Sequence, residues 1–133
     1  MTKLLIIAIG GAIGAVLRYA VSGLPYKYFD AVFPYGTMLV NLSGAYIIGI
    51  LFAFSERVEI PTEWRLFVFI GILGAYTTFS TFALESSNLI RDREFLYALW
   101  NFLVTNIGGV ALVFLGFITT RAFFRLFVLF KGR

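Results

Sequence analysis

The sequence contains no cysteine and no histidine, and only 14% of its 133 residues are charged. Without cysteine the chain can form no disulfide, and it offers neither a thiol nucleophile nor a thiolate metal ligand. Without histidine it also lacks the commonest metal ligand and the commonest general base. We therefore expect neither a hydrolase triad nor a zinc site, and we do not expect an enzyme.

Apolar residues dominate what is present. They account for 60% of the chain, and the mean hydropathy is +0.91. A water-soluble domain of this size cannot bury so much apolar surface, and in average domains about a quarter of the residues are charged. The composition predicts an all-α integral membrane protein, folded as a single transmembrane domain over residues 1–133.

Four apolar stretches are long enough to cross a membrane. They cover residues 4–24, 35–54, 64–90 and 95–120. Each reaches the roughly 20 residues that a helix needs to span about 30 Å of hydrocarbon. Short polar connections join them, and a basic tail follows at residues 121–133. With its net charge of +4, the chain is expected to contact anionic headgroups of the lipid bilayer, and no nucleic acid.

The basic residues outside the tail give no clear orientation. Apart from Arg18 inside the first stretch, one membrane side would hold Lys3, Arg57 and Arg65, and the other would hold Lys27, Arg91 and Arg93. Positive residues normally gather on the cytoplasmic side of a membrane protein. The even count leaves two interpretations open. Either the chain inserts in both orientations, or the tail alone places its own side in the cytoplasm.

The third stretch contains the unusual run GAYTTFSTF at residues 74–82. A helix can absorb one or two threonine hydroxyls by bonding them to its own carbonyls. Four hydroxyls beside Gly74 at mid-membrane depth instead indicate a broken helix, whose freed carbonyls suit a hard cation. Phe79 and Phe82 lie three residues apart and share a face. The positive edges of their rings could contact an anion without a formal positive charge. A formal positive charge would bind the anion too tightly for it to leave.

Other polar residues interrupt the second and fourth stretches. A polar stripe lies on one face of the fourth stretch, where Tyr97, Asn101 and Thr105 follow one another at four-residue intervals. Three polar residues in register suggest a hydrated path along this helix. The neighbouring Asn106 points elsewhere, and we interpret it as a packing residue. Asn41, in the second stretch, is either an interhelical hydrogen-bonding partner or a pore-lining donor.

The first stretch has two features of its own. Gly10 and Gly14 are four residues apart, a spacing of small residues that lets two helix backbones approach closely in lipid. Arg18 lies well inside the stretch. Its long side chain either reaches the nearby interface or places a positive charge at an anion-permeable vestibule.

Three sequence blocks resemble a known family. GGAIGAVLRY (residues 10–19), GTMLVNLSG (36–44) and GAYTTFSTF (74–82) are similar to signature blocks of the Fluc, or CrcB, fluoride channels of microbes. The resemblance covers all four stretches. It implies an antiparallel, dual-topology homodimer in a prokaryotic cell membrane, with two fluoride pores and a structural sodium ion (Na+) between the subunits. The expected function is passive fluoride efflux, which protects the cell from fluoride toxicity.

The resemblance also implies roles for particular residues. The backbone carbonyls of Gly74 and Thr77 would hold the sodium ion, and Arg18 would lie near a vestibule. The residues expected along the pores are Asn41, Phe79, Ser80, Thr81, Phe82, Tyr97, Asn101 and Thr105.

The chain departs from the family pattern at a few positions. Ala75 stands where many relatives have glycine, Asn101 where tyrosine is frequent, and Thr105 where serine is frequent. Glu85 matches the pattern but receives no role from the resemblance.

A small proton-coupled multidrug exporter is the alternative, because such exporters are also four-span, dual-topology dimers. They depend on a membrane-embedded carboxylate near the middle of the first helix, where this chain has Arg18 and no acid. A structural subunit without transport would fit the glycine-rich helix faces, but not the central run of hydroxyls and aromatic rings.

Overall fold

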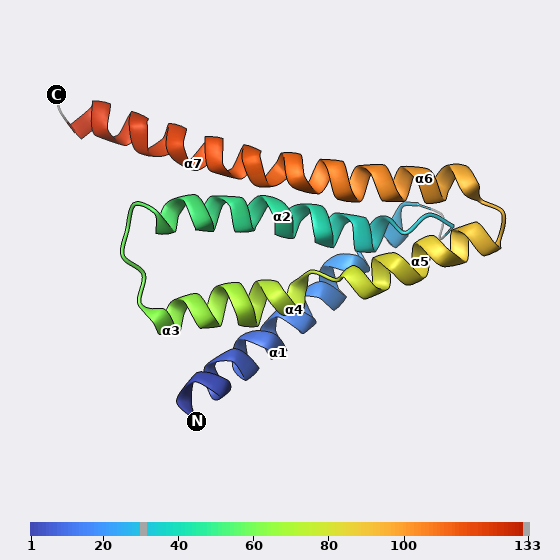
Figure 1. Cartoon of the computed structure of the whole chain (residues 1–133), viewed down its shortest axis with the longest axis horizontal. Helices are drawn as coiled ribbons and strands as arrows, with labels where there is room; N and C mark the ends of the chain where they lie inside the picture. Colours follow the sequence, from blue (N-terminus) through green and yellow to red (C-terminus); the bar gives the residue numbers. More distant parts are fainter. Residues whose placement is uncertain (30–31, 132–133) are drawn as a thin grey trace.

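The computed structural model describes residues 1–29 and 32–131, which form helices joined by short connections (Figure 1). In chain order the elements are α1 (Thr2–Ser22), η1 (Pro25–Lys27), α2 (Tyr35–Ser55), α3 (Thr62–Arg65), η2 (Leu66–Leu73), α4 (Gly74–Tyr76), α5 (Phe79–Arg91), α6 (Phe95–Leu103), η3 (Val104–Gly108) and α7 (Gly109–Lys131). The short η1 is a 3₁₀ turn. The elements η2 and η3 are π-helical, so their hydrogen bonds reach one residue further than those of an α-helix.

These elements join into four long apolar helices, which run from Thr2 to Lys27, from Tyr35 to Ser55, from Thr62 to Arg91 and from Phe95 to Leu129. Each is long and apolar enough to cross a membrane, which confirms the prediction of an all-helical chain with four candidate spans. The last helix extends past the predicted residue 120, because α7 continues to Lys131. No glycine or proline lies between Gly116 and Gly132, so two isolated arginines are not enough to end the helix.

The four helices alternate in direction, and both chain ends lie at the same end of the molecule (Figure 1). The second helix, α2, packs along α7, while α1 packs against η2 and α4. The short α5 packs against α6, which follows it in the chain. The third helix, which contains η2, α4 and α5, therefore contacts the other three helices.

The contact between α1 and the third helix depends on the predicted pair of glycines. Gly10 and Gly14 are both buried in α1. A Cβ atom on Gly14 would overlap the carbonyl of Ile72, and one on Gly10 would lie 2.6 Å from the carbonyl oxygen of Phe67. Any larger residue would push the two backbones apart. The small-residue spacing seen in the sequence thus corresponds to a close helix–helix contact.

Most large apolar side chains point outward rather than into a core. Leu4, Val16 and Ile107 each keep more than half of their surface exposed, whereas Val40 and Phe82 belong to a small group of buried residues. In water such an exterior would be unfavourable, but lipid tails are as apolar as these side chains. The distribution of apolar surface is that of a chain surrounded by lipid.

Candidate functional site

The third helix is interrupted at Thr77 and Thr78, between α4 and α5 (Figure 1). Thr77 has φ −78° and ψ 158°, and Thr78 has φ −150° and ψ 117°, so both adopt extended conformations. β-Branched residues such as threonine favour this conformation. Thr78 also caps α5, because its hydroxyl accepts a hydrogen bond of 3.3 Å from the amide of Thr81. The interruption falls within the run GAYTTFSTF.

Asn41 of α2 pairs with the backbone at this interruption. Its side-chain oxygen accepts a 2.8 Å hydrogen bond from the amide of Thr78, and its side-chain nitrogen donates a 3.0 Å bond to the carbonyl of Thr78. One amide side chain therefore replaces the helical partner of the Thr78 amide and adds a bond to the Thr78 carbonyl. Of the two interpretations left open for Asn41, the structure shows the interhelical hydrogen bond.

A second side chain of α2 holds the other flank of the interruption. The hydroxyl of Ser43 lies 2.8 Å from the hydroxyl of Tyr76, which is buried at the end of α4. Gly44, next to it, leaves room for Thr77, since a Cβ atom there would overlap the Thr77 methyl group. The sequence interpretation missed Ser43 and Tyr76, although both lie within the blocks that carry the resemblance.

Several backbone carbonyls lose their helical partners at the interruption, and two of them matter for the predicted cation. In a continuous helix the amide of Thr78 would donate to the carbonyl of Gly74, but it donates to Asn41. The amide of Thr81 would donate to the carbonyl of Thr77, but it donates to the Thr78 hydroxyl. The carbonyls released in this way belong to Gly74 and Thr77, the two residues expected to hold a cation.

A pocket beside these carbonyls opens to the outside of the subunit. It has a volume of about 270 Å³, and Asn41, Gly74 and Thr77 contribute to its lining together with apolar residues of α2 and η2. Gly74 itself is exposed, and a Cβ atom on it would meet only the carbonyl of Phe69, at 3.7 Å. Packing within the subunit therefore does not cover this side of α4.

Phe79 and Phe82 lie close together but in different surroundings. Their ring centroids are 5.8 Å apart at an interplanar angle of 49°, and both line a pocket of about 220 Å³. Phe82 is 5% exposed, whereas Phe79 is 76% exposed at the first position of α5. The predicted pair therefore exists, with one ring fixed in the subunit and the other on its surface.

The same pocket receives residues from α2, the interruption and the fourth helix. Its lining also includes Asn41, Thr77, Thr78, Thr105 and Asn106. The sequence interpretation set Asn106 aside as a packing residue, and its amide does donate a 2.7 Å bond to the carbonyl of Phe102. It nevertheless lines the pocket beside Thr105, because both lie in η3, where the wider π-helical turn changes the helix phase.

The expected polar stripe of the fourth helix is only partly continuous. Asn101 is 1% exposed and donates a 3.0 Å hydrogen bond to the hydroxyl of Ser86 in α5, while Thr105 donates to Asn101 at 3.4 Å. Tyr97 is 41% exposed, and its ring lies edge-on to Phe33 with centroids 5.7 Å apart. Asn101 and Thr105 thus form one polar pair that connects α5 with the pocket, and Tyr97 lies beyond it.

Arg18 and Thr81 line a separate polar pocket of about 370 Å³ between α1, α2 and the start of α5. Its polar lining also includes Thr37, Thr78, Ser22 and Tyr19. Arg18 is half-buried, which places a guanidinium group beside threonine hydroxyls. Ser80 does not join this lining: it is exposed, and its hydroxyl lies 3.5 Å from that of Thr78.

Glu85 connects this polar pocket with the interior of the subunit. One carboxylate oxygen accepts a 2.7 Å hydrogen bond from Thr37, whose hydroxyl is buried on α2. The other oxygen is buried and has no hydrogen-bond partner within residues 1–29 and 32–131. Thr37 lies four residues before Asn41, so the helical spacing alone could have identified it as part of the same polar face.

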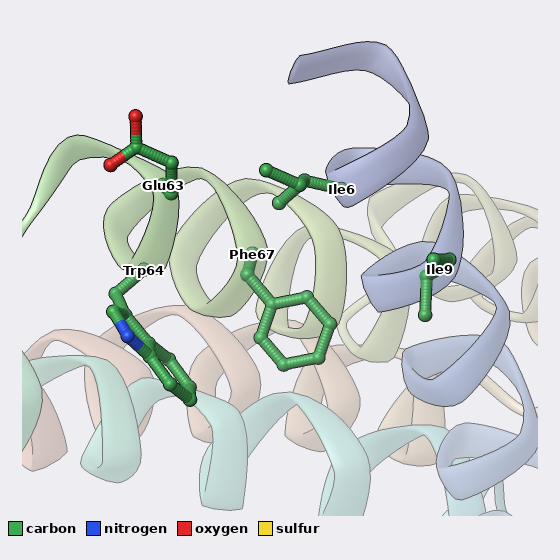
Figure 2. A pocket seen from close by; sticks show the side chains of 5 residues that line it. All are labelled: Ile6, Ile9, Glu63, Trp64 and Phe67. Atoms are coloured by element: carbon green, nitrogen blue, oxygen red, sulfur yellow. The ribbon is translucent and has the colours of Figure 1, made fainter. Parts of the chain in front are cut away.

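A further hollow, of about 290 Å³, lies away from this polar site. Figure 2 shows Ile6 and Ile9 of α1 facing Phe67 and Trp64 across it. Almost all of its lining is apolar, as expected for a surface recess of a lipid-facing helix pair. Its one charged lining residue, Glu63, turns its carboxylate away from the ring of Phe67.

Side-chain metal ligands do not assemble in the part of the chain that the structure describes. No group of three or more acidic residues comes together there, and the sequence has no histidine or cysteine. The released carbonyls of Gly74 and Thr77 are oxygen donors of the kind that hard cations prefer.

Comparisons with known proteins agree with these features. Residues 5–117 match the family described as CrcB-like protein, Camphor Resistance (CrcB). A protein of Shewanella amazonensis named fluoride-specific ion channel FluC is 43% identical over 116 residues, which cover 87% of this chain and 94% of that protein. A protein of the same name from Geobacter sp. strain M21 is 43% identical over 123 residues, covering 92% and 99%.

The matched region includes the interrupted helix and every candidate site residue. The relatives are named as ion channels, which confirms the expectation that the chain is not an enzyme. The extent of the match and the level of identity over most of both chains show that this protein belongs to the CrcB family.

Proposed function

We propose that the protein is a fluoride-selective ion channel that allows passive fluoride efflux across a prokaryotic plasma or inner membrane and so protects the cell from fluoride toxicity. The observation that carries this proposal is the interruption at Thr77 and Thr78, whose freed backbone groups lie beside a pair of phenylalanine rings. The relatives named fluoride-specific ion channel FluC support the choice of ion.

The working unit in this proposal is a homodimer. Gly74, Phe79, Ser80 and Thr81 are all exposed on the subunit, around an interruption that lies near the middle of a 30-residue apolar helix. Hydrocarbon cannot satisfy polar backbone at such a depth, so these groups need protein or water against them. A second copy that packs over this face covers them, and a two-fold axis brings the same groups from both subunits together.

An antiparallel arrangement of the two copies fits the charge distribution. Apart from the basic tail, the even count of basic residues on the two sides of the four helices gives neither orientation an advantage. Two copies of opposite orientation would bury identical faces against one another across the membrane midplane. The dimer would then have two equivalent ion pathways, one beside each copy of Phe79 and Phe82.

A sodium ion at the two-fold axis would stabilise such a dimer. Each subunit supplies the released carbonyls of Gly74 and Thr77, so two copies offer four oxygen ligands around one point. When bound, the cation neutralises carbonyl dipoles that would otherwise face each other across the interface. Within each subunit Asn41 keeps the Gly74 carbonyl free by holding the Thr78 amide, and the Thr78 hydroxyl holds the Thr81 amide away from the Thr77 carbonyl.

The ion pathway in this proposal begins at the polar pocket with Arg18, where the guanidinium attracts anions. It continues along Thr81, Ser80 and Thr78 to the pocket between Phe79, Phe82 and Thr105. Beyond that, Asn101 and Tyr97 extend it along the fourth helix. Fluoride is strongly hydrated, so hydroxyl and amide donors must replace its water along the way.

The aromatic pair provides weak anion contacts between these donors. Ring edges carry partial positive charge, so an anion can meet Phe79 and Phe82 without the strong attraction of a full cation. Weak contacts in series permit rapid release, which conduction requires. The multidrug exporter is not favoured, because α1 (Thr2–Ser22) contains Lys3 and Arg18 but no acidic residue.

The test is ion efflux from phospholipid vesicles that contain the purified protein. Vesicles are loaded with potassium fluoride, potassium is released with an ionophore, and external fluoride is followed with a fluoride electrode. We expect rapid fluoride efflux and no comparable chloride efflux from matched vesicles. Equal chloride efflux would exclude selectivity, and an absence of fluoride efflux from vesicles with intact dimers would exclude the channel.

A further inference from the structure

The end of α7 extends beyond the other helices. Figure 1 shows it projecting past the connection between α2 and α3. At 21 residues, α2 is about 31 Å long, close to the thickness of the hydrocarbon layer. Arg121 lies 3.6 Å from Glu56, the residue just after α2, so this ion pair marks the level where α2 ends. Residues 121–131 therefore lie outside the hydrocarbon.

This extension is longer than the headgroup layer is thick. From Arg121 to Lys131 the helix rises by about 15 Å. The headgroup layer adds about 5–7 Å on each side of the hydrocarbon. If the helix stayed upright, its last turns would project into water. Tilting the subunit would not solve this, because α2 runs alongside α7 and already matches the hydrocarbon thickness.

The extension is too apolar to project into water. Phe123, Leu126, Phe127 and Val128 are between 56% and 67% exposed in the subunit. Phe123, Leu126 and Phe127 follow the spacing i, i+3, i+4, which places them on one helix face. The rings of Phe123 and Phe127 stack at 6.5 Å. We call Phe123, Leu126 and Phe127 the tail stripe.

Two basic residues lie on the opposite side of the extension, next to the exposed Val128. Arg121 and Arg125 are four residues apart and exposed, roughly opposite the tail stripe. A different residue, Phe124, packs against Phe54 at the end of α2, with ring centroids 5.7 Å apart. This contact and the Arg121–Glu56 pair fix the base of the extension to the subunit, and neither uses the tail stripe.

We propose that residues 121–131 form an interfacial anchor, which bends onto the membrane and binds anionic phospholipid headgroups. The tail stripe enters the boundary between headgroups and acyl chains, and the arginines contact lipid phosphates. Amphipathic helices of this kind lie in the interface plane. The bilayer is the nearest apolar phase, since the extension leaves it directly, and the two arginines complement its anionic headgroups. The segment lies outside residues 5–117, which match the CrcB family.

Site-directed labelling can test this, because the chain has no native cysteine. Phe127→Cys places a nitroxide label on the tail stripe, and Val128→Cys places it on another face of the same turn, as a matched control. Each full-length variant is incorporated into vesicles of phosphatidylcholine with phosphatidylglycerol, and into vesicles of phosphatidylcholine alone. The accessibility of each label to oxygen, which enriches in lipid, is compared with its accessibility to a water-soluble nickel chelate.

In vesicles with phosphatidylglycerol, we expect the label at 127 to favour oxygen and the label at 128 to favour the nickel chelate. Without anionic lipid, the label at 127 should become more accessible to nickel. Adding Arg125→Gln to Phe127→Cys should lower the ratio of bound to free segment about fivefold, since one basic residue contributes about 1 kcal/mol at such a surface.

Two results would overturn the proposal. One is equal nickel accessibility at positions 127 and 128 in vesicles with phosphatidylglycerol. The other is a label at position 127 whose protection from the nickel chelate increases with protein density and does not depend on lipid charge. That result would mean that the tail stripe packs against a second copy of the chain. Fluoride efflux is measured on the same vesicles, so a failure of the anchor remains distinct from a failure of the channel.

Discussion

Replacing Asn41 tests whether one amide side chain maintains the interruption of the third helix. Asn41→Ala removes the acceptor for the Thr78 amide at 2.8 Å and the donor to the Thr78 carbonyl at 3.0 Å. Each buried backbone group left without a partner costs about 1–3 kcal/mol. The Thr78 carbonyl caps the start of α5 and keeps its helical bond, so the variant should lose about 1–3 kcal/mol of unfolding free energy, unless the chain rearranges to satisfy the Thr78 amide.

Such a rearrangement would be informative. If Thr78 returned to a helical conformation, its amide would bond the carbonyl of Gly74, and that oxygen would no longer be free for a cation. Asn41→Ala should then fold but lose sodium-dependent stability. The two outcomes are separated by measuring unfolding in detergent with sodium and with a large organic cation in its place.

Asn106→Ala is the matched control, because it removes an amide of the same type from the same pocket. Its 2.7 Å bond reaches only the carbonyl of Phe102 in its own helix. We expect a loss of about 1 kcal/mol, with sodium dependence retained. If Asn41→Ala were as stable and as sodium-dependent as Asn106→Ala, the role assigned to Asn41 would be wrong.

Three further predictions follow from the packing and the proposed ion. Gly14→Ala should disrupt the contact of α1 with Ile72 and lower the melting temperature, whereas Gly11→Ala should not, since no atom lies within 4 Å of a Cβ atom there. Thr37→Val should lower the free energy of unfolding by about 1–3 kcal/mol, because it leaves Glu85 without its hydroxyl donor. Thr37→Ser keeps the hydroxyl and should keep the stability. Equal stability of the two variants would argue against this bond. Replacing sodium by a large organic cation should lower the thermal stability of the wild-type dimer, and an unchanged transition would remove the case for a structural sodium ion.

The four helices could be predicted from the sequence because lipid imposes a simple rule. A helix must be apolar over about 20 residues to cross the membrane, and such stretches are visible without knowing their neighbours. The end of the fourth helix was harder to predict. Arg121 suggests the membrane boundary, but helical backbone does not stop at that boundary, and α7 continues to Lys131.

The site could be predicted only in part, because its function depends on contacts between distant residues. The run of hydroxyls at residues 74–82 indicates an interruption, which the structure shows at Thr77 and Thr78, while a cation at Gly74 and Thr77 stays a prediction. The sequence could not decide between two roles for Asn41, since that required knowing that Thr78, 37 positions away, faces it. The hydrogen bond between Thr37 and Glu85 joins residues 48 positions apart, so the sequence could not predict it either.

Asn106 illustrates a different limit. Its assignment to packing assumed a regular α-helix, in which it points away from Thr105. The π-helical segment η3 changes that phase and places both residues in the lining of one pocket. Nothing in the local sequence VTNIG marks the change, so the error came from the assumed helix geometry rather than from the residue type.

The most direct test of the proposed pathway is the effect of Phe79→Ala on fluoride efflux from vesicles. Phe79 is 76% exposed in the subunit, so its removal should change subunit stability by only about 0.5 kcal/mol. Phe82, by contrast, is buried, so Phe82→Ala should lower the free energy of unfolding by about 3–5 kcal/mol. We expect Phe79→Ala to retain the dimer, measured by size-exclusion chromatography, and to lose fluoride efflux. Wild-type efflux from an intact Phe79→Ala dimer would contradict the proposal that fluoride passes beside these rings.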